Sequence, residues 1–425
     1  MHHRCASTMG GASRDPAWYD RPVSRRAVTT AGLLAPLAAL LAGCGSSASA
    51  GPRTLRVLDT YTNEPDRSFI GKRLEEAARR AGVSLERVSV SGDSLIQRVL
   101  QQGSSGTLPD ILMLDNPNLQ QIAATTALRP FDELGIPTEG YADGVLAAGT
   151  HGGRVYGLAP NVNTIALFYD VRALDEAGVE PPTTWDELRA AAGELTQGSR
   201  YGLAFCGNAT YEGTWQYLPF FWSNGADERE ITSPEAAAAL GLLADVVGAG
   251  HASSSVLNWS QADVKDQFVA GRAAMMVNGP WQIPELETIE GLEYGVVPLP
   301  VRDPRTQEPV APLGGEVWTV PATGDRAKER LAAAVLTDFL SDDSQLTLGE
   351  QRFTVPGKPA LAGEYLRRRP EMETFVDLIE NARARTGLLG DEWPTTATAL
   401  YTGLQLALSG QASPAEALQE AGEYV

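Results

Sequence analysis

Apolar residues beyond the N-terminal region recur with two different spacings, which predict alternating strands and helices. Short apolar runs at residues 55–58, 83–90 and 111–114 are typical of strands. The segments 67–81 and 95–100 carry apolar residues at helical spacing instead. Because strands and helices alternate, we expect a parallel sheet with helices on both of its faces. The pattern therefore indicates an α/β fold.

A later stretch, residues 259–281, repeats the change from helix to strand. Ser260 and Asp263 have the spacing of a capping box at the start of a predicted helix. A wholly apolar run at residues 273–277 then predicts a buried strand. We expect Trp281 just beyond the carboxyl end of this strand, where open α/β sheets bind ligands. A core position is the other interpretation of Trp281, and this stretch alone does not decide between the two.

Polar loops are expected after the first and third predicted strands. Residues 59–64 read Asp-Thr-Tyr-Thr-Asn-Glu, and residues 115–118 read Asp-Asn-Pro-Asn. Carboxylates and amides hydrogen-bond to hydroxyl groups, and aromatic faces cover the C–H side of a sugar ring. Because both loops fall at equivalent strand ends, we favour a site for a polyhydroxylated ligand over ordinary turn chemistry. Neither the glycine pattern of dinucleotide-binding folds nor a GxxxxGK[ST] loop follows the first strand. This argues against a dehydrogenase or an ATPase.

Length and charge narrow the class of protein further. A chain of 425 residues is long for one core and favours two domains or lobes. Without residues 1–43, which contain five Arg and two Asp, the formal charge of −19 becomes −22. Such a charge argues against a nucleic-acid partner and against a surface that lies flat on anionic lipid.

The first 50 residues are typical of an export signal rather than of a folded domain. Arg25 and Arg26 precede an apolar run at residues 31–42, which is too short for a transmembrane helix. The run ends in Leu-Ala-Gly-Cys at residues 41–44 and resembles a bacterial lipobox, which implies lipidation of Cys44. An ordinary secretory signal is the alternative. The twin-arginine export route and a start at Met9 both remain open.

A family resemblance begins at residues 151–170, HGGRVYGLAPNVNTIALFYD, and continues in AGVEPPTTWDEL at residues 177–188. Further matching segments are GTWQYLPFFWSNG at 213–225, FVAGRAAM at 268–275, NGPW at 278–281 and LGGE at 313–316. These segments, in this order, resemble the carbohydrate-binding solute receptors of ABC importers, relatives of maltose-binding protein. The resemblance implies a two-lobed periplasmic-binding-protein-like fold of type II, with several crossings and a ligand cleft between two α/β lobes.

The resemblance also implies an organisation of the chain and a set of ligand-binding residues. We expect a signal peptide at 1–43, a lipid-anchored tether at 44–53, a first lobe at 54–161 and 299–345, and a second lobe at 162–298 and 346–425. The main ligand candidates are Asp115, Asn116, Asn163, Tyr211, Glu212, Trp215, Trp281, Gly314, Gly315 and Glu316. Weaker candidates are Tyr61, Asn63, Trp259, Trp318, Arg352 and Trp393.

Two departures from the family pattern bear on the ligand. Leu114 stands where maltodextrin-binding members carry an aromatic residue, and the predicted helix at 395–408 has no Trp. A long maltodextrin is therefore in doubt, whereas a monosaccharide or disaccharide remains open.

Catalysis and cofactors find little support in the sequence. No motif pairs two carboxylates as a glycosidase requires, and no GxSxG elbow is present. His151 and His251 lack metal-ligand spacing, so we expect no metal and no cofactor. Cys206 is left without a partner for a disulfide and is expected to be a buried thiol.

The sequence as a whole predicts a monomeric, exported lipoprotein on the outer face of the cytoplasmic membrane. It would capture a carbohydrate by hinge closure and deliver it to an ABC permease with a cytoplasmic ATPase. The same fold could instead bind another polar solute such as a glycerol phosphodiester. A third possibility is an exported carbohydrate-active enzyme.

Overall fold

The computed structural model describes residues 53–125 and 127–423. The predicted signal peptide, Cys44 and nearly all of the predicted tether lie outside these residues. Within the described part of the chain, no helix combines the length and the apolar character that a membrane span requires.

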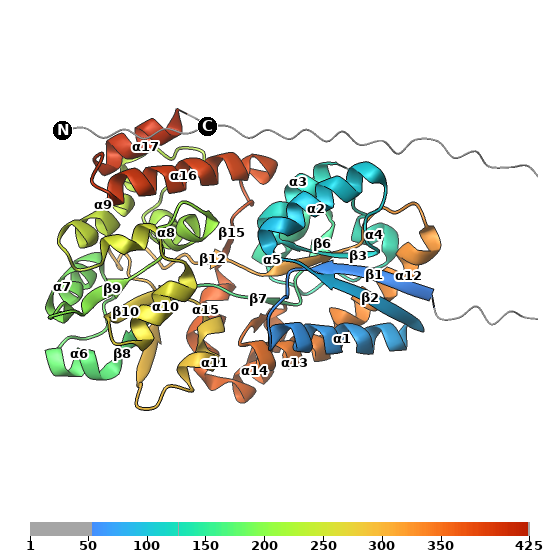
Figure 1. Cartoon of the computed structure of the whole chain (residues 1–425), viewed down its shortest axis with the longest axis horizontal. Helices are drawn as coiled ribbons and strands as arrows, with labels where there is room; N and C mark the ends of the chain where they lie inside the picture. Colours follow the sequence, from blue (N-terminus) through green and yellow to red (C-terminus); the bar gives the residue numbers. More distant parts are fainter. Residues whose placement is uncertain (1–52, 126, 424–425) are drawn as a thin grey trace, which may run out of the picture. The chain divides into compact units, whose positions relative to one another are not determined.

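The first lobe is built around a five-stranded sheet in the order β2-β1-β3-β13-β6, and its strands are Val83–Ser89, Arg53–Asp59, Ile111–Asp115, Glu316–Thr319 and Gly157–Leu158. β1 is parallel to both of its neighbours, as the pattern of residues 55–114 predicts, whereas β13 joins β3 antiparallel. Figure 1 shows α2 and α3 on one face of the sheet and α1 with α12 and α13 on the other. The helices of this lobe are α1 (Asp66–Arg80), α2 (Gly92–Ser105), α3 (Asn116–Ala124), α4 (Phe131–Leu134), α5 (Asp143–Gly149), α12 (Arg326–Phe339) and α13 (Asp342–Arg352).

The second lobe is built around a four-stranded sheet in the order β11-β8-β10-β9, and its strands are Tyr294–Val297, Ala166–Asp170, Ala273–Asn278 and Tyr201–Ala204. β10 is the predicted apolar strand, and all of its residues are buried. The helices here are α6 (Val171–Ala177), α7 (Trp185–Leu195), α8 (Tyr211–Ser223), α9 (Pro234–Gly248), α10 (Gln261–Val269), α11 (Ile283–Leu286), α15 (Glu373–Glu380), α16 (Trp393–Leu408) and α17 (Pro414–Gly422). α16 packs on α8 and α9, and the predicted capping box at the start of α10 is present.

Two short ladders lie where the chain passes between the sheets. β7 (Asn161–Val162) pairs with β14 (Val355–Pro356), and β12 (Pro312–Leu313) pairs with β15 (Arg383–Ala384). The crossing strands are also joined by two backbone hydrogen bonds between Asn163 and Gly314, of 2.8 and 3.2 Å. These ladders hold together segments that are far apart in the sequence.

Several segments differ from the sequence-based expectations. The expected polar loop at residues 115–118 is the start of helix α3, because Pro117 favours the first turn of a helix. The segment 301–310, expected in the first lobe, contacts the second, where the amide of Val310 donates to Ser223 Oγ at 2.8 Å. The expected boundary at residue 345 falls inside α13, which packs on α1 of the first lobe. Both lobe assignments depend on long-range contacts that the local pattern does not encode.

Candidate functional site

A cavity of about 460 Å³ is lined by side chains from both lobes. The residues around it come from strand ends, helix starts and the crossing segments. Those expected as main ligand candidates are Asp115, Asn163, Tyr211, Glu212, Trp215, Trp281, Gly314, Gly315 and Glu316. Tyr61 and Arg352, the weaker candidates, also line it, together with Asp66, Gln261, Thr354 and Arg385, which sequence reasoning did not name.

Trp281 lies in a short 3-10 turn, η2 (Pro280–Gln282), directly after strand β10. Its ring folds back over Gly279, where a Cβ atom would stand only 2.1 Å from Trp281 Cζ3. Gly279 has an extended backbone that any residue can adopt, so the requirement for glycine is one of space. This close approach places the half-buried indole at the cavity wall.

Gly314 has a similar role at the crossing. A Cβ atom there would lie 2.0 Å from Asn163 Oδ1 and 2.8 Å from Trp215 Cη2. Its neighbour Gly315 has a φ of 130°, a conformation that strongly favours glycine. Gly314 therefore lets an amide and an indole approach the backbone, and Gly315 supplies the turn that leads into Glu316.

One polar network in the cavity belongs to the first lobe. The Tyr61 hydroxyl donates to Glu316 Oε2 at 2.7 Å, and burial raises the pKa of Tyr61 well above its ordinary value. The guanidinium of Arg352 lies 4.7 Å from the centre of the Tyr61 ring and donates to Asp66 Oδ2 at 3.0 Å. The next residue, Phe353, has a φ of 52°, an uncommon conformation that ends α13 and turns the chain toward Thr354.

Arg385 connects the two lobes. Its Nη2 donates to Asp115 Oδ1 at 3.0 Å and to Asn116 Oδ1 at 3.1 Å, at the end of β3. Its guanidinium also lies 4.6 Å from the centre of the Trp215 ring on α8. Asn116 is buried beneath this contact and donates to the Leu313 carbonyl, so it does not line the cavity.

Glu212 stands in the first turn of α8, where the helix dipole favours a carboxylate. Its Oε2 accepts from the backbone amide of Gln261 at 3.3 Å and faces the Cys206 thiol at 3.9 Å. Cys206 is free and fully buried, as predicted, and burial raises the pKa of its thiol to about 12. A thiol with this pKa is not a nucleophile at neutral pH.

The match to known proteins decides the family. The family model described as bacterial extracellular solute-binding protein matches residues 72–374, most of the chain. The chain belongs to this family. The two-lobed fold expected from the sequence is also confirmed, because the solute-binding protein shares its fold with solved structures of sugar receptors.

Individual relatives are distant but cover most of the solute-binding protein. A binding protein from Brucella abortus is 25% identical, with 92% of this chain and 96% of the relative covered. A maltooligosaccharide ABC transporter solute-binding lipoprotein from Streptococcus pneumoniae is 23% identical, with 79% and 82% covered.

Two solved structures show the same fold. The cyclic alpha-maltosyl-1,6-maltose binding protein from Arthrobacter globiformis is 23% identical, with a TM-score of 0.77 and coverage of 88% of this chain and 98% of that one. UgpB from Mycobacterium tuberculosis, solved in complex with glycerophosphocholine, is 20% identical, with a TM-score of 0.74 and coverage of 88% and 97%.

Four of the weaker ligand candidates do not line the cavity of this solute-binding protein. Trp318 is 1% exposed and packs edge-on against Phe339 in the first lobe. Trp393 is also 1% exposed and lies in the core of the second lobe. Trp259 is partly buried among apolar side chains, and Asn63 is exposed to solvent. These positions give a packing role to the three indoles.

Three cavity residues that the sequence did not single out, and Arg352, which it did, share a feature. Gln261 Oε1, Arg352 Nε, Thr354 Oγ1 and Arg385 Nε are buried without a hydrogen-bond partner in the described part of the chain. Buried polar atoms are normally paired, so unpaired ones along a cavity indicate room for a polar ligand or water. A signal existed only for Gln261, which follows the capping residue Ser260 at the start of the helix before Trp281.

Proposed function

We propose that this protein is the carbohydrate receptor of an ABC importer. The observation that carries the proposal is the composition of the cavity. Indole and phenol rings line it together with carboxylates and an amide, and this combination suits the two faces of a sugar ring. The named ligands of relatives support it, because several are malto-oligosaccharides.

The proposed mechanism needs no chemical step. Because the cavity takes side chains from both lobes, a ligand that contacts Asp115 on one side and Trp281 on the other favours the closed arrangement. The short ladders at the crossings would serve as the hinge. A volume of about 460 Å³ fits a small ligand and supports a monosaccharide, a disaccharide or a short oligosaccharide.

A receptor for a glycerol phosphodiester is the second candidate, and one observation favours it. Arg352 and Arg385 line the cavity, and guanidinium groups bind phosphate well. Each of them, however, already donates to a carboxylate, Asp66 or Asp115. A phosphate would have to compete with these ion pairs, so the sugar receptor remains the stronger proposal.

We also propose that the mature protein is a monomer anchored outside the cytoplasmic membrane by lipid on Cys44. The lipobox-like segment supports this, and so does the relative named a solute-binding lipoprotein. Delivery of the sugar to a membrane permease with a cytoplasmic ATPase completes the proposed role.

The test is a thermal-shift screen of the purified protein against monosaccharides, disaccharides, oligosaccharides and glycerol phosphodiesters. We expect a sugar to raise the melting temperature, because a ligand that binds only the folded state stabilises it. Trp281→Ala should abolish the shift, and Trp281→Phe, which keeps a flat ring, should retain part of it.

The outcomes separate the candidates. A shift with phosphodiesters alone contradicts the sugar proposal and favours the second candidate. An equal shift in wild type and Trp281→Ala would place the ligand away from this indole. Chromatography of the sugar after incubation should recover it unchanged, and a shortened product would show an enzyme instead.

A further inference from the structure

The cavity has an excess of negative charge that the sugar-receptor proposal does not by itself require. Four carboxylates line the cavity, those of Asp66, Asp115, Glu212 and Glu316. Within the described part of the chain, only two cationic groups line it, the guanidinium groups of Arg352 and Arg385. No lysine or histidine is among the described lining residues. The formal charge of the lining is therefore −2.

The ion pairs show where this excess lies. Arg385 neutralises Asp115, and Arg352 neutralises Asp66, each with a contact of 3.0 Å. Glu212 and Glu316 form no ion pair within the described residues; the first accepts from an amide and a thiol, and the second from the Tyr61 hydroxyl. The two unpaired carboxylates are thus those of Glu212 and Glu316.

One aromatic ring of the cavity is free to contact a cationic group of a ligand. Tyr61 and Trp215 each already have a guanidinium over the ring, at 4.7 and 4.6 Å from its centre. The half-buried ring of Trp281 has no cation over it in the described part of the chain. A cation near an electron-rich ring and a carboxylate gains from both.

Unpaired polar atoms add independent evidence for a polar ligand in this cavity. Thr354 Oγ1 and Gln261 Oε1 can both accept a hydrogen bond, and neither has a donor within the described residues. Both residues line the cavity, and Thr354 is 5% exposed. Arg352 Nε and Arg385 Nε are unpaired donors in the same cavity, so the lining suits a ligand that offers both N–H donors, as an ammonium group does, and acceptors, as sugar hydroxyls do.

We infer that the preferred ligand is a saccharide that carries a free amino group, with the ammonium bound near Glu212 and the ring against Trp281. This inference rests on the proposed function and names its substrate class. Hydroxyl groups of a neutral sugar can also bond to carboxylates, so the inference has to be tested with matched sugars in which a hydroxyl, ammonium or acetamido group occupies the same ring position.

The experiment measures calorimetric affinity for two matched sets of probes. The first set is glucose, glucosamine and N-acetylglucosamine; the second is cellobiose, the β-1,4 disaccharide of glucosamine, and diacetylchitobiose. We expect the amine to bind about tenfold more tightly than either neutral partner, which is the size of effect that one partly desolvated charge pair gives. The advantage should shrink in high salt.

Substitutions test whether Glu212 accounts for the preference for amino sugars. Glu212→Gln keeps the shape and removes the charge, so it should bring the amine to within about twofold of the neutral sugar. Glu316→Gln should reduce the advantage to a smaller extent. Glu235→Gln is the matched control, because Glu235 also lies in the first turn of a helix but outside the cavity. The melting temperature without ligand shows whether each variant is folded.

The results distinguish this inference from the function on which it rests. Equal or tighter binding of a neutral or N-acetylated partner overturns the amine preference and leaves the sugar receptor standing. Failure of every amine probe to bind also overturns it. Binding of glycerophosphocholine with no binding of any sugar overturns the inference and the proposed function together.

Discussion

At the scale of single residues, the position of Trp281 depends on its neighbour Gly279. The indole lies so close to the backbone that a methyl group at residue 279 would overlap ring carbons. The backbone there suits any residue, and the clashing atoms belong to one side chain that can rotate away. A larger residue should therefore displace the ring without disrupting the fold.

We predict that Gly279→Ala weakens ligand binding about tenfold, comparable to the loss of one aromatic contact with the ligand. Calorimetry with the sugar identified in the screen measures the affinity, and the melting temperature without ligand should change little. Gly241→Ala is the control, because Gly241 lies in α9 and an added Cβ there has ordinary space. Unchanged affinity in Gly279→Ala would contradict the role given to this glycine.

A cavity position could be predicted for a residue that follows a recognisable strand, and could not be predicted for a residue placed by distant pairing. Trp281 comes directly after an apolar run, which indicated its position, whereas Glu212, in the first turn of α8, was named only through the family resemblance. Arg385 reaches the cavity only because β15 pairs with β12, more than 60 residues earlier in the chain. Trp318 shows the opposite error, because it lies in β13, the strand that begins with the cavity residue Glu316, but its indole is buried in the core.

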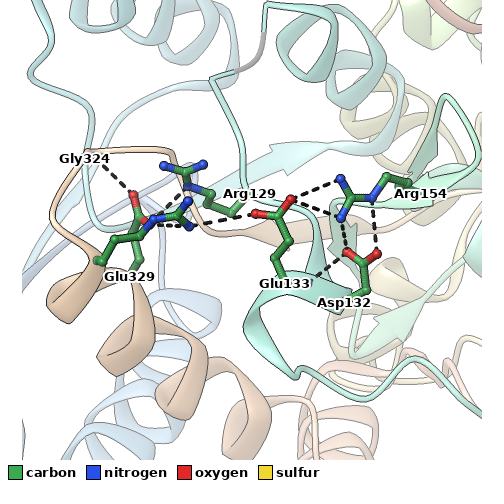
Figure 2. Close-up of polar contacts among 7 residues, drawn as sticks. Arg129, Asp132, Glu133, Arg154, Gly324 and Glu329 are labelled. Atoms are coloured by element: carbon green, nitrogen blue, oxygen red, sulfur yellow. Dashed lines mark hydrogen bonds and ion pairs between the residues drawn. The ribbon is translucent and has the colours of Figure 1, made fainter.

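At the scale of elements, a group of ion pairs joins α4, β5 (Arg154–Val155) and α12 of the first lobe (Figure 2). Arg154 forms ion pairs with Asp132 and Glu133, whose side chains are 66% and 39% exposed. Glu329 is different, because its side chain is 1% exposed and accepts from Arg129, Arg326 and the Gly324 amide. One buried carboxylate thus links the start of α12 to the segment before α4.

We predict that Glu329→Ala lowers the free energy of unfolding by about 2–3 kcal/mol, because it leaves Arg129 and a backbone amide without their buried acceptor. Asp132→Ala removes an exposed partner and should have a much smaller effect. Denaturant titration of the two variants compares them directly. A similar loss in both would mean that burial of Glu329 does not decide its contribution.

The longer helices were predictable because each buries one face at a regular spacing, and β3 and β10 because each is a continuous apolar run. α1 and β3 lie within two residues of their expected bounds. The two-residue strands at the crossings were not predictable, since two residues show no period. These short strands would form the proposed hinge, so the local pattern describes the lobes better than the crossings between them.

At the scale of the whole molecule, the family match and the cavity agree on a receptor made of two lobes that share one chain. The acidic charge of the mature chain fits a protein held near a membrane by a tether rather than by its surface. The anchor is the part of this proposal that lies outside the described residues.

We predict that Cys44→Ser releases the protein from the membrane fraction into the medium or periplasm. The substitution removes the residue proposed to be acylated, which is the only proposed anchor, and no helix in the described chain could replace it. Fractionation of cells and labelling with radioactive palmitate measure the change. Membrane retention of the unlabelled variant would point to another attachment.

The antiparallel strand β13 has a consequence for synthesis of the chain. Asp115 of β3 pairs with Glu316 of β13, about 200 residues later. Strand β3 therefore lacks this neighbouring strand until most of the protein has been made. At ordinary rates of translation this interval lasts roughly 10 to 40 s. Throughout it the apolar edge of β3 can pair with another strand, which favours aggregation. A holding chaperone during synthesis should therefore matter more for yield than the stability of the finished fold.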